Sequence, residues 1–211
     1  MRHPSPKELG FSLAWIFSEV LPGHFERDRE EVEGKRFPIV GPLAPDGRYT
    51  LPKEDPDSRG PFVYLLCDRT GSICYVGKAT EANLTSPIER WIRPDLTGLK
   101  EYWAHGTNKK SKSTIERIAE GIASGLGPYA LHFASYARIS NMLAEKRLSQ
   151  SVSHDVEVLP PSDYMSAVER VLIHRLQPAW NGPGKKSPPP PAMAALIDAW
   201  LSKASTGLIS Q

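Results

Sequence analysis

The sequence has few cysteines, no long apolar run and almost no net charge. Two cysteines in 211 residues do not make a disulfide framework. No run approaches the about 18 apolar residues of a transmembrane helix, and the N-terminus lacks the apolar stretch of a secretion signal. We therefore expect a cytoplasmic protein without a membrane partner. The net charge of +2 is no argument for a nucleic-acid partner, which must be argued from a local site.

Apolar residues at 40% and charged residues at 24% are typical of a folded protein, and the length fits one domain with flanking segments. A helix is expected over residues 5–21, where Ser5 and Glu8 form a capping-box pattern ahead of regularly spaced apolar residues. We expect three regions: an N-terminal helix and extended arm (1–60), a core (61–182) with an insert at about 94–139, and a Pro-rich spacer with a terminal helix (183–211).

Two short runs rich in β-branched and aromatic residues, Phe62 to Asp68 and Ile73 to Gly77, predict a β-hairpin. If Thr70-Gly71 is a two-residue loop, Tyr64 faces Gly77 and Leu66 faces Tyr75. Both tyrosines then lie on one face of the hairpin. The same register makes Cys67 face Cys74, and these two core thiols lie on the other face.

The rest of the pattern predicts an α+β fold: a small central antiparallel sheet, made of the hairpin and a third strand, flanked by helices. Helices are expected to start at Pro87–Ile92 and to cover about 113–125, 138–148, 162–176 and the apolar residues from Met193 to Leu201; strands are expected at Tyr129–Tyr136 and Asp155–Leu159.

Glu169 shares one stripe of its expected helix with Met165, Leu172, Ile173 and Leu176. The carboxylate therefore projects from the core-facing side, and it needs a cation, a hydrogen-bond donor or an opening to solvent. A divalent metal would satisfy it. The helix pattern alone favours a simpler explanation, a carboxylate at the edge of the stripe that pairs with an arginine.

Other candidate residues also have simple structural explanations when each is taken alone. Strand aromatics, solvated basic residues and a helix-terminating asparagine account for all of them. Their order and spacing distinguish them as a set. They are Tyr64, Tyr75, Lys78, Arg90, Arg93, His105, Lys109, Lys110, Lys112 and Asn181.

This set resembles the GIY-YIG nuclease family. Val63-Tyr64 is similar to the first half-motif, Tyr75-Val76-Gly77-Lys78 to the second, and Glu169 followed by Pro178 and Asn181 to the last helix of the family. The resemblance covers about residues 61–182 and is closest to restriction-type and excision-repair members. It implies a Mg²⁺-dependent endonuclease, with Mn²⁺ as a substitute, that hydrolyses phosphodiester bonds of double-stranded DNA.

The resemblance also implies a role for each residue. Glu169 would bind the metal, which polarises the scissile phosphate. Tyr64 would accept a proton from the attacking water, with its pKa lowered by Lys78 or the metal, and Tyr75 would orient the water or the phosphate. Arg90 would contact phosphate oxygens, and Asn181 would hold the site or touch the phosphate.

Two departures from the family pattern leave alternatives open. The interval from Tyr75 to Arg90 is longer than usual, so Arg93 competes for the role of Arg90. Pro94 stands where the family commonly has His or Tyr, so His105 is an alternative for that role.

We expect a sequence-specific, restriction-type enzyme, because segments on both sides of the core are free to read DNA. The insert supplies residues suited to phosphate and base contacts, namely Trp103, His105, Asn108, Lys109, Lys110 and Lys112. The alternatives are a structure-specific repair or recombination nuclease and a non-catalytic DNA-binding module. Cleavage of both strands with one site per chain favours a homodimer, to which the terminal helix is one candidate contributor.

Overall fold

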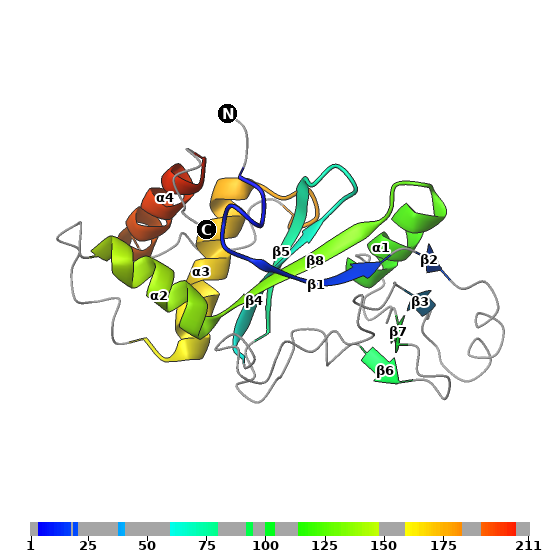
Figure 1. Cartoon of the computed structure of the whole chain (residues 1–211), viewed down its shortest axis with the longest axis horizontal. Coiled ribbons are helices and arrows are strands. Elements are labelled where there is room, and N and C mark those ends of the chain that lie inside the picture. The colour runs from blue at the N-terminus through cyan, green and yellow to red at the C-terminus, as the bar shows by residue number, and fades with distance from the viewer. Residues whose placement is uncertain are drawn as a thin grey trace.

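Figure 1 shows a computed structural model of the chain, in which helices pack against an antiparallel sheet. The structure describes residues 4–17, 19–20, 38–40, 60–79, 92–94, 100–103, 114–147, 159–182 and 191–205. The fold is α+β, as the sequence predicts. None of the helices in these ranges is long and apolar enough to cross a membrane.

The main sheet contains the expected hairpin as β4 (Phe62–Cys67) and β5 (Ile73–Ala79). Its strand order is β1-β8-β4-β5, with β1 (Ser12–Phe17) and β8 (Tyr129–Ser135) continuing it beyond the hairpin. All neighbouring strands are antiparallel. The expected strand near Tyr129 is therefore the third strand of the central sheet, although it lies within the residues assigned to an insert.

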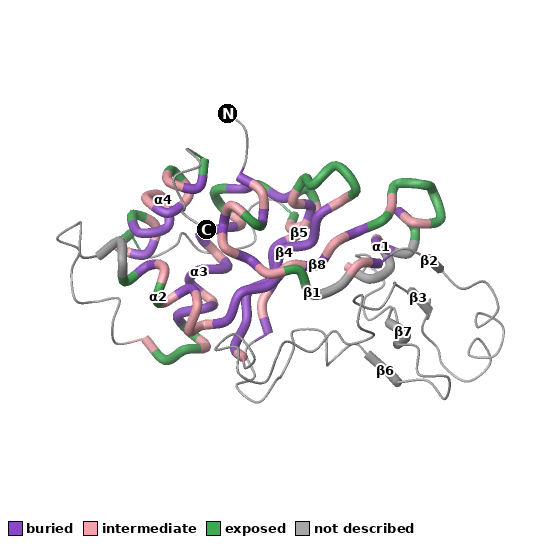
Figure 2. Tube along the Cα trace, viewed as in Figure 1, coloured by how far each residue is buried: buried purple, intermediate pink, exposed green. Residues whose placement is uncertain are grey.

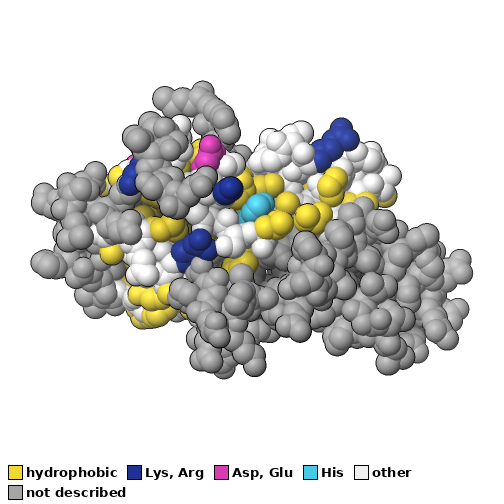
Figure 3. Space-filling view, in the orientation of Figure 1, with side chains coloured by type: hydrophobic (Ala, Val, Ile, Leu, Met, Phe, Trp, Pro, Cys, Tyr) yellow, Lys and Arg dark blue, Asp and Glu magenta, His cyan; other side chains and the backbone are white. Residues whose placement is uncertain are grey.

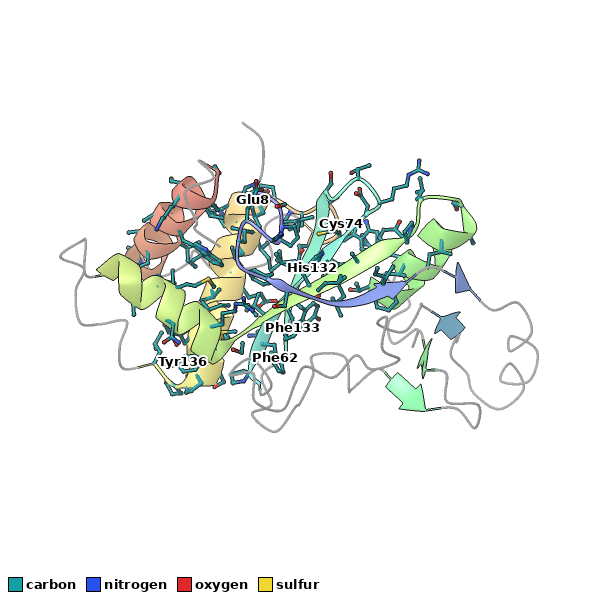
Figure 4. The ribbon with its side chains drawn as sticks, in the orientation of Figure 1. Glu8, Phe62, Cys74, His132, Phe133 and Tyr136 are labelled. Atoms are coloured by element: carbon teal, nitrogen blue, oxygen red, sulfur yellow. The ribbon has the colours of Figure 1, made fainter. Side chains whose placement is uncertain are left out.

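β4 is the core of this sheet because it lies between β5 and β8 and is buried along its whole length. Figure 2 shows the trace of β4 in the colour of buried residues. At one end of the sheet Phe62 packs edge-on against Phe133, with ring centroids 5.5 Å apart, and Cys74 lies toward the other end (Figure 4). The central strand therefore takes apolar contacts on both faces, which favours a continuous hydrophobic run over alternation.

The helix expected over residues 5–21 is wrong. Its capping box does form: the Ser5 N–H donates to Glu8 Oε2 at 2.6 Å, and the Glu8 N–H donates to Ser5 Oγ at 3.3 Å. The turn then ends at Gly10, whose φ of 75° is a left-handed conformation that glycine adopts without strain. Ser12–Phe17 continues as β1, because β8 offers it a partner strand.

The hairpin loop differs from the expected two-residue turn. Gly71 adopts φ 82°, the Asp68 N–H donates to the Ser72 carbonyl, and the loop includes Arg69 as well as Thr70. The register shifts by a bulge next to Cys67, so Cys67 pairs with Ile73 and not with Cys74. The predicted pairing of the two cysteines is therefore wrong, although both are buried, free thiols.

Two helices, α2 (Tyr136–Arg147) and α3 (Pro161–Leu176), contact strands of the main sheet, and α4 (Pro191–Ser205) packs against these two helices (Figure 1). All three were expected, but α3 has Pro160 as its N-cap in place of Ser162. α4 is part of the core, and the Trp200 ring stacks on Phe11 with centroids 6.1 Å apart. The apolar stripe of α4 is therefore buried within the chain.

A second antiparallel sheet contains short strands in the order β2-β3-β7-β6. It joins the N-terminal region, through β2 (Glu19–Val20) and β3 (Pro38–Val40), to β6 (Ile92–Pro94) and β7 (Lys100–Trp103). The expected helix α1 (Thr114–Ala123) contacts β2. Ile92 is in a strand, so the helix expected to start at Pro87 does not include it; residues 87–91 and 155–158 lie outside the described ranges.

The two thiols are predicted to resist alkylation in the native protein. Burial raises the pKa of Cys67 and of Cys74 to about 12, so the reactive thiolate is scarce at pH 8. Iodoacetamide at pH 8 should modify neither thiol until the chain is unfolded, as measured by mass spectrometry with and without guanidinium. Rapid modification of both thiols in folded protein would show that the hairpin is not buried as described.

Candidate active site

The two tyrosines lie on the same face of the hairpin, as the predicted register requires. Tyr64 pairs with Gly77 and Leu66 pairs with Tyr75. The two phenol rings have centroids 6.1 Å apart and planes inclined by 36°. Tyr64 is buried and Tyr75 is half-buried. The bulge that separates the cysteines lies closer to the loop, so it leaves this pair in register.

The absence of a side chain at Gly77 leaves the space that the Tyr64 ring occupies. A Cβ added at Gly77 would lie 2.4 Å from Cζ of Tyr64 and 2.5 Å from its hydroxyl oxygen, far inside contact distance. The ring therefore lies across the backbone of β5, and its hydroxyl reaches this strand at the edge of the described sheet. A glycine is needed here for close approach and not for an unusual φ.

Tyr75 is held as a neutral phenol. Burial is the main cause that raises its pKa above 10, and the charge of Glu169 raises it further, while hydrogen bonds with Thr114 and Tyr64 act in the opposite direction. Glu169 is thus close enough to Tyr75 to affect its ionisation. Thr114, the first residue of α1, was not among the predicted site residues, although a helix was expected to start at about residue 113.

Glu169 occupies the buried stripe of α3 that the helix pattern predicts. It is 6% exposed, and Met165 and Leu172 on the same stripe are fully buried. The cation beside it is Lys78 of β5, whose Nζ lies 3.8 Å from Glu169 Oε2. Lys78 Nζ also donates a hydrogen bond to the hydroxyl of Ser166, one turn earlier on α3.

Asn181 binds backbone at the edge of β5. Its Oδ1 accepts from the Val76 N–H at 2.7 Å, and its Nδ2 donates to the Val76 carbonyl at 2.7 Å. The neighbouring Trp180 N–H donates to the Cys74 carbonyl at 2.9 Å. Both halves of the Asn181 amide are therefore engaged with the backbone of β5.

The remaining predicted residues are not brought into this cluster by the described part of the chain. The backbone of Arg93 lies in β6, paired with Glu101. Arg90, His105, Lys109, Lys110 and Lys112 lie outside the described residues. On the face shown in Figure 3, the described Lys and Arg side chains are dispersed among apolar and neutral groups. On this face the described residues therefore form no basic patch.

The donor set at Glu169 fits a hard cation. Among the described residues, no group of three or more His, Cys, Asp or Glu side chains could hold a metal ion. Mg²⁺ accepts one or two carboxylates together with water and phosphate oxygens, so the Glu169 carboxylate is the kind of group that would serve it as a protein ligand. Comparison with models of protein families, with curated proteins and with solved structures gives no match to this chain.

Gly77→Ala is predicted to displace the Tyr64 phenol. The added methyl group overlaps the ring, so we expect a loss of about 1–3 kcal/mol in the free energy of unfolding. In a Tyr64→Val background the ring is gone, and the same substitution should cost much less. Urea denaturation of the four proteins in this cycle measures the coupling, and additive costs would mean that the ring does not cover Gly77.

Asn181→Ala is predicted to destabilise the protein by about 1–3 kcal/mol, because it leaves the N–H and carbonyl of Val76 without their partner at a half-buried site. Thermal and urea unfolding measure the effect. Unchanged stability, combined with loss of DNA cleavage, would instead show that the amide acts on the phosphate.

Proposed function

We propose that this chain is a metal-dependent endonuclease of the GIY-YIG kind that hydrolyses phosphodiester bonds in double-stranded DNA. The supporting observations are the adjacent phenols of Tyr64 and Tyr75, the ion pair of Lys78 with Glu169, and the effect of the Glu169 charge on Tyr75, all at β5. The resemblance in sequence assigned these four residues to one reaction, and the geometry is compatible with that assignment.

The chemistry follows from the environment of each group. Glu169 would hold Mg²⁺ or Mn²⁺, which when bound polarises the scissile phosphate and stabilises the leaving oxygen. Tyr64 would hold the attacking water at the edge of β5 and accept its proton. Tyr75, kept protonated by burial and by the charge of Glu169, would donate a hydrogen bond to the water or to a phosphate oxygen. Lys78 would balance charge beside the phosphate, and Arg90 is the guanidinium proposed to bind it.

We infer that the enzyme is of restriction type and reads a sequence. The second sheet supports this choice, because it joins strands of the N-terminal region to β6 and β7 and so forms one structure outside the hairpin and its helices. Digestion of mixed plasmid DNA with Mg²⁺ should give discrete fragments. Cutting of branched substrates alone would indicate the structure-specific alternative, and binding without cutting would indicate a non-catalytic module.

Glu169→Gln is predicted to lower the rate of DNA cleavage by about 10²- to 10³-fold, because the loss of charge removes the anchor for the divalent cation. Asp163→Asn is the matched control, since it makes the same change at an exposed position in the first turn of α3. Rates are measured on supercoiled plasmid, DNA binding by fluorescence anisotropy and folding by circular dichroism. Normal cutting by Glu169→Gln, or its unfolding, would contradict the proposed role.

A further inference from the structure

The hydroxyl of Ser166 can only accept a hydrogen bond from Lys78. A serine hydroxyl has one proton, and Ser166 Oγ donates it to the carbonyl of Ser162, 2.7 Å away and one turn earlier in α3. Lys78 Nζ must then be the donor to Ser166 Oγ. The direction of both hydrogen bonds is therefore fixed, and the Lys78 ammonium group is held at Ser166 of α3.

The hydrogen bond to Ser166 holds Lys78 near Glu169, and Lys78 and Glu169 form no direct hydrogen bond with each other. The Nζ to Oε2 distance is 3.8 Å, whereas a charge-assisted hydrogen bond is about 2.7–2.9 Å long. The Lys78 side chain is 33% exposed and the Glu169 side chain 8% exposed, so the ammonium faces solvent more than the carboxylate does. Lys78 therefore lies beside Glu169 without forming a hydrogen bond to it.

We propose that Ser166 is a positioning residue that acts through Lys78 to favour the binding of a divalent cation at the Glu169 carboxylate. This inference depends on the proposed metal role of Glu169 and adds a condition to it. The ammonium is close enough to offset the charge of the enclosed carboxylate, yet it is held back from the oxygens that the cation needs. Without the serine, the flexible lysine closes onto Glu169 and competes with the metal.

Substitutions at the two positions should therefore change metal affinity in opposite directions. Ser166→Ala should weaken Mn²⁺ binding about tenfold, the size of effect expected when a group that positions a metal site is lost. Lys78→Met removes a competing positive charge and should tighten Mn²⁺ binding by roughly three- to tenfold. In the double variant there is no lysine to hold, so it should bind Mn²⁺ as Lys78→Met does.

Titration of the full chain with Mn²⁺ at pH 7.5 in the absence of DNA, following free Mn²⁺ by electron paramagnetic resonance, measures these affinities. Ser162→Ala is the control, since Ser162 contributes its carbonyl oxygen, which alanine retains. Ser166→Thr keeps the hydroxyl and should bind as the native protein does. Glu169→Gln should abolish the site, and circular dichroism checks the fold of each variant.

Three results would overturn the inference: no Mn²⁺ binding by the native chain, equal affinities for native protein and Ser166→Ala, or a further loss from Ser166→Ala in the Lys78→Met background. If Lys78→Met does not fold, the comparison of Ser166→Ala with Ser166→Thr still decides. The inference and the proposed function fail separately. If the variants bind Mn²⁺ with the predicted affinities but the protein cleaves no DNA, only the proposed function is contradicted. If the protein cleaves DNA but Ser166→Ala binds Mn²⁺ as the native protein does, only the role of Ser166 is contradicted.

Discussion

The arrangement depends on the pairing of the Asn181 amide with both backbone groups of Val76, across a separation of 105 residues in sequence. β5 is the last strand of the main sheet, and its outward N–H and carbonyl groups need partners. The segment after α3 provides them, so the end of that helix is fixed to the strand that carries Tyr75, Gly77 and Lys78. The position of Glu169 relative to the phenols follows from this attachment.

The electrostatic interactions at the site differ between the two faces of β5. On one face, burial and the charge of Glu169 keep Tyr75 protonated, which suits a hydrogen-bond donor. Toward α3, Lys78 offsets the charge of an enclosed carboxylate that would otherwise be costly to bury. Gly77 between them leaves the space through which the Tyr64 ring crosses the strand. Residues 75–78 thus supply a hydrogen-bond donor, a position without a side chain and a cation.

Local chemistry explains why the sequence predicted some elements and not others. The phenol register was predictable because strand alternation and the glycine of the turn determine it, and the bulge lies on the loop side of both tyrosines. The pairing of Cys67 with Cys74 failed because Gly71 closes a longer loop. The N-terminal helix failed because the capping box is real but ends at Gly10, and the strand partner of Ser12–Phe17 lies more than a hundred residues away.

The patterns in the sequence did not predict how elements far apart in the chain pack against one another. The amphipathic stripe of α4 predicted a helix but not its place against Phe11 in the core. Likewise, the pattern of α3 showed that Glu169 faces inward without showing that Lys78 and Ser166 meet it there. Such contacts depend on which elements become neighbours, and short sequence windows do not contain that information.

Crystals of the protein with Mn²⁺ and a non-cleavable DNA duplex would test the convergence most directly, through anomalous scattering from the metal. We predict an anomalous peak at the Glu169 carboxylate, with a DNA phosphate between it and the hydroxyl groups of Tyr64 and Tyr75. A metal bound elsewhere, or a duplex whose phosphates do not approach the two phenols, would contradict the proposed site.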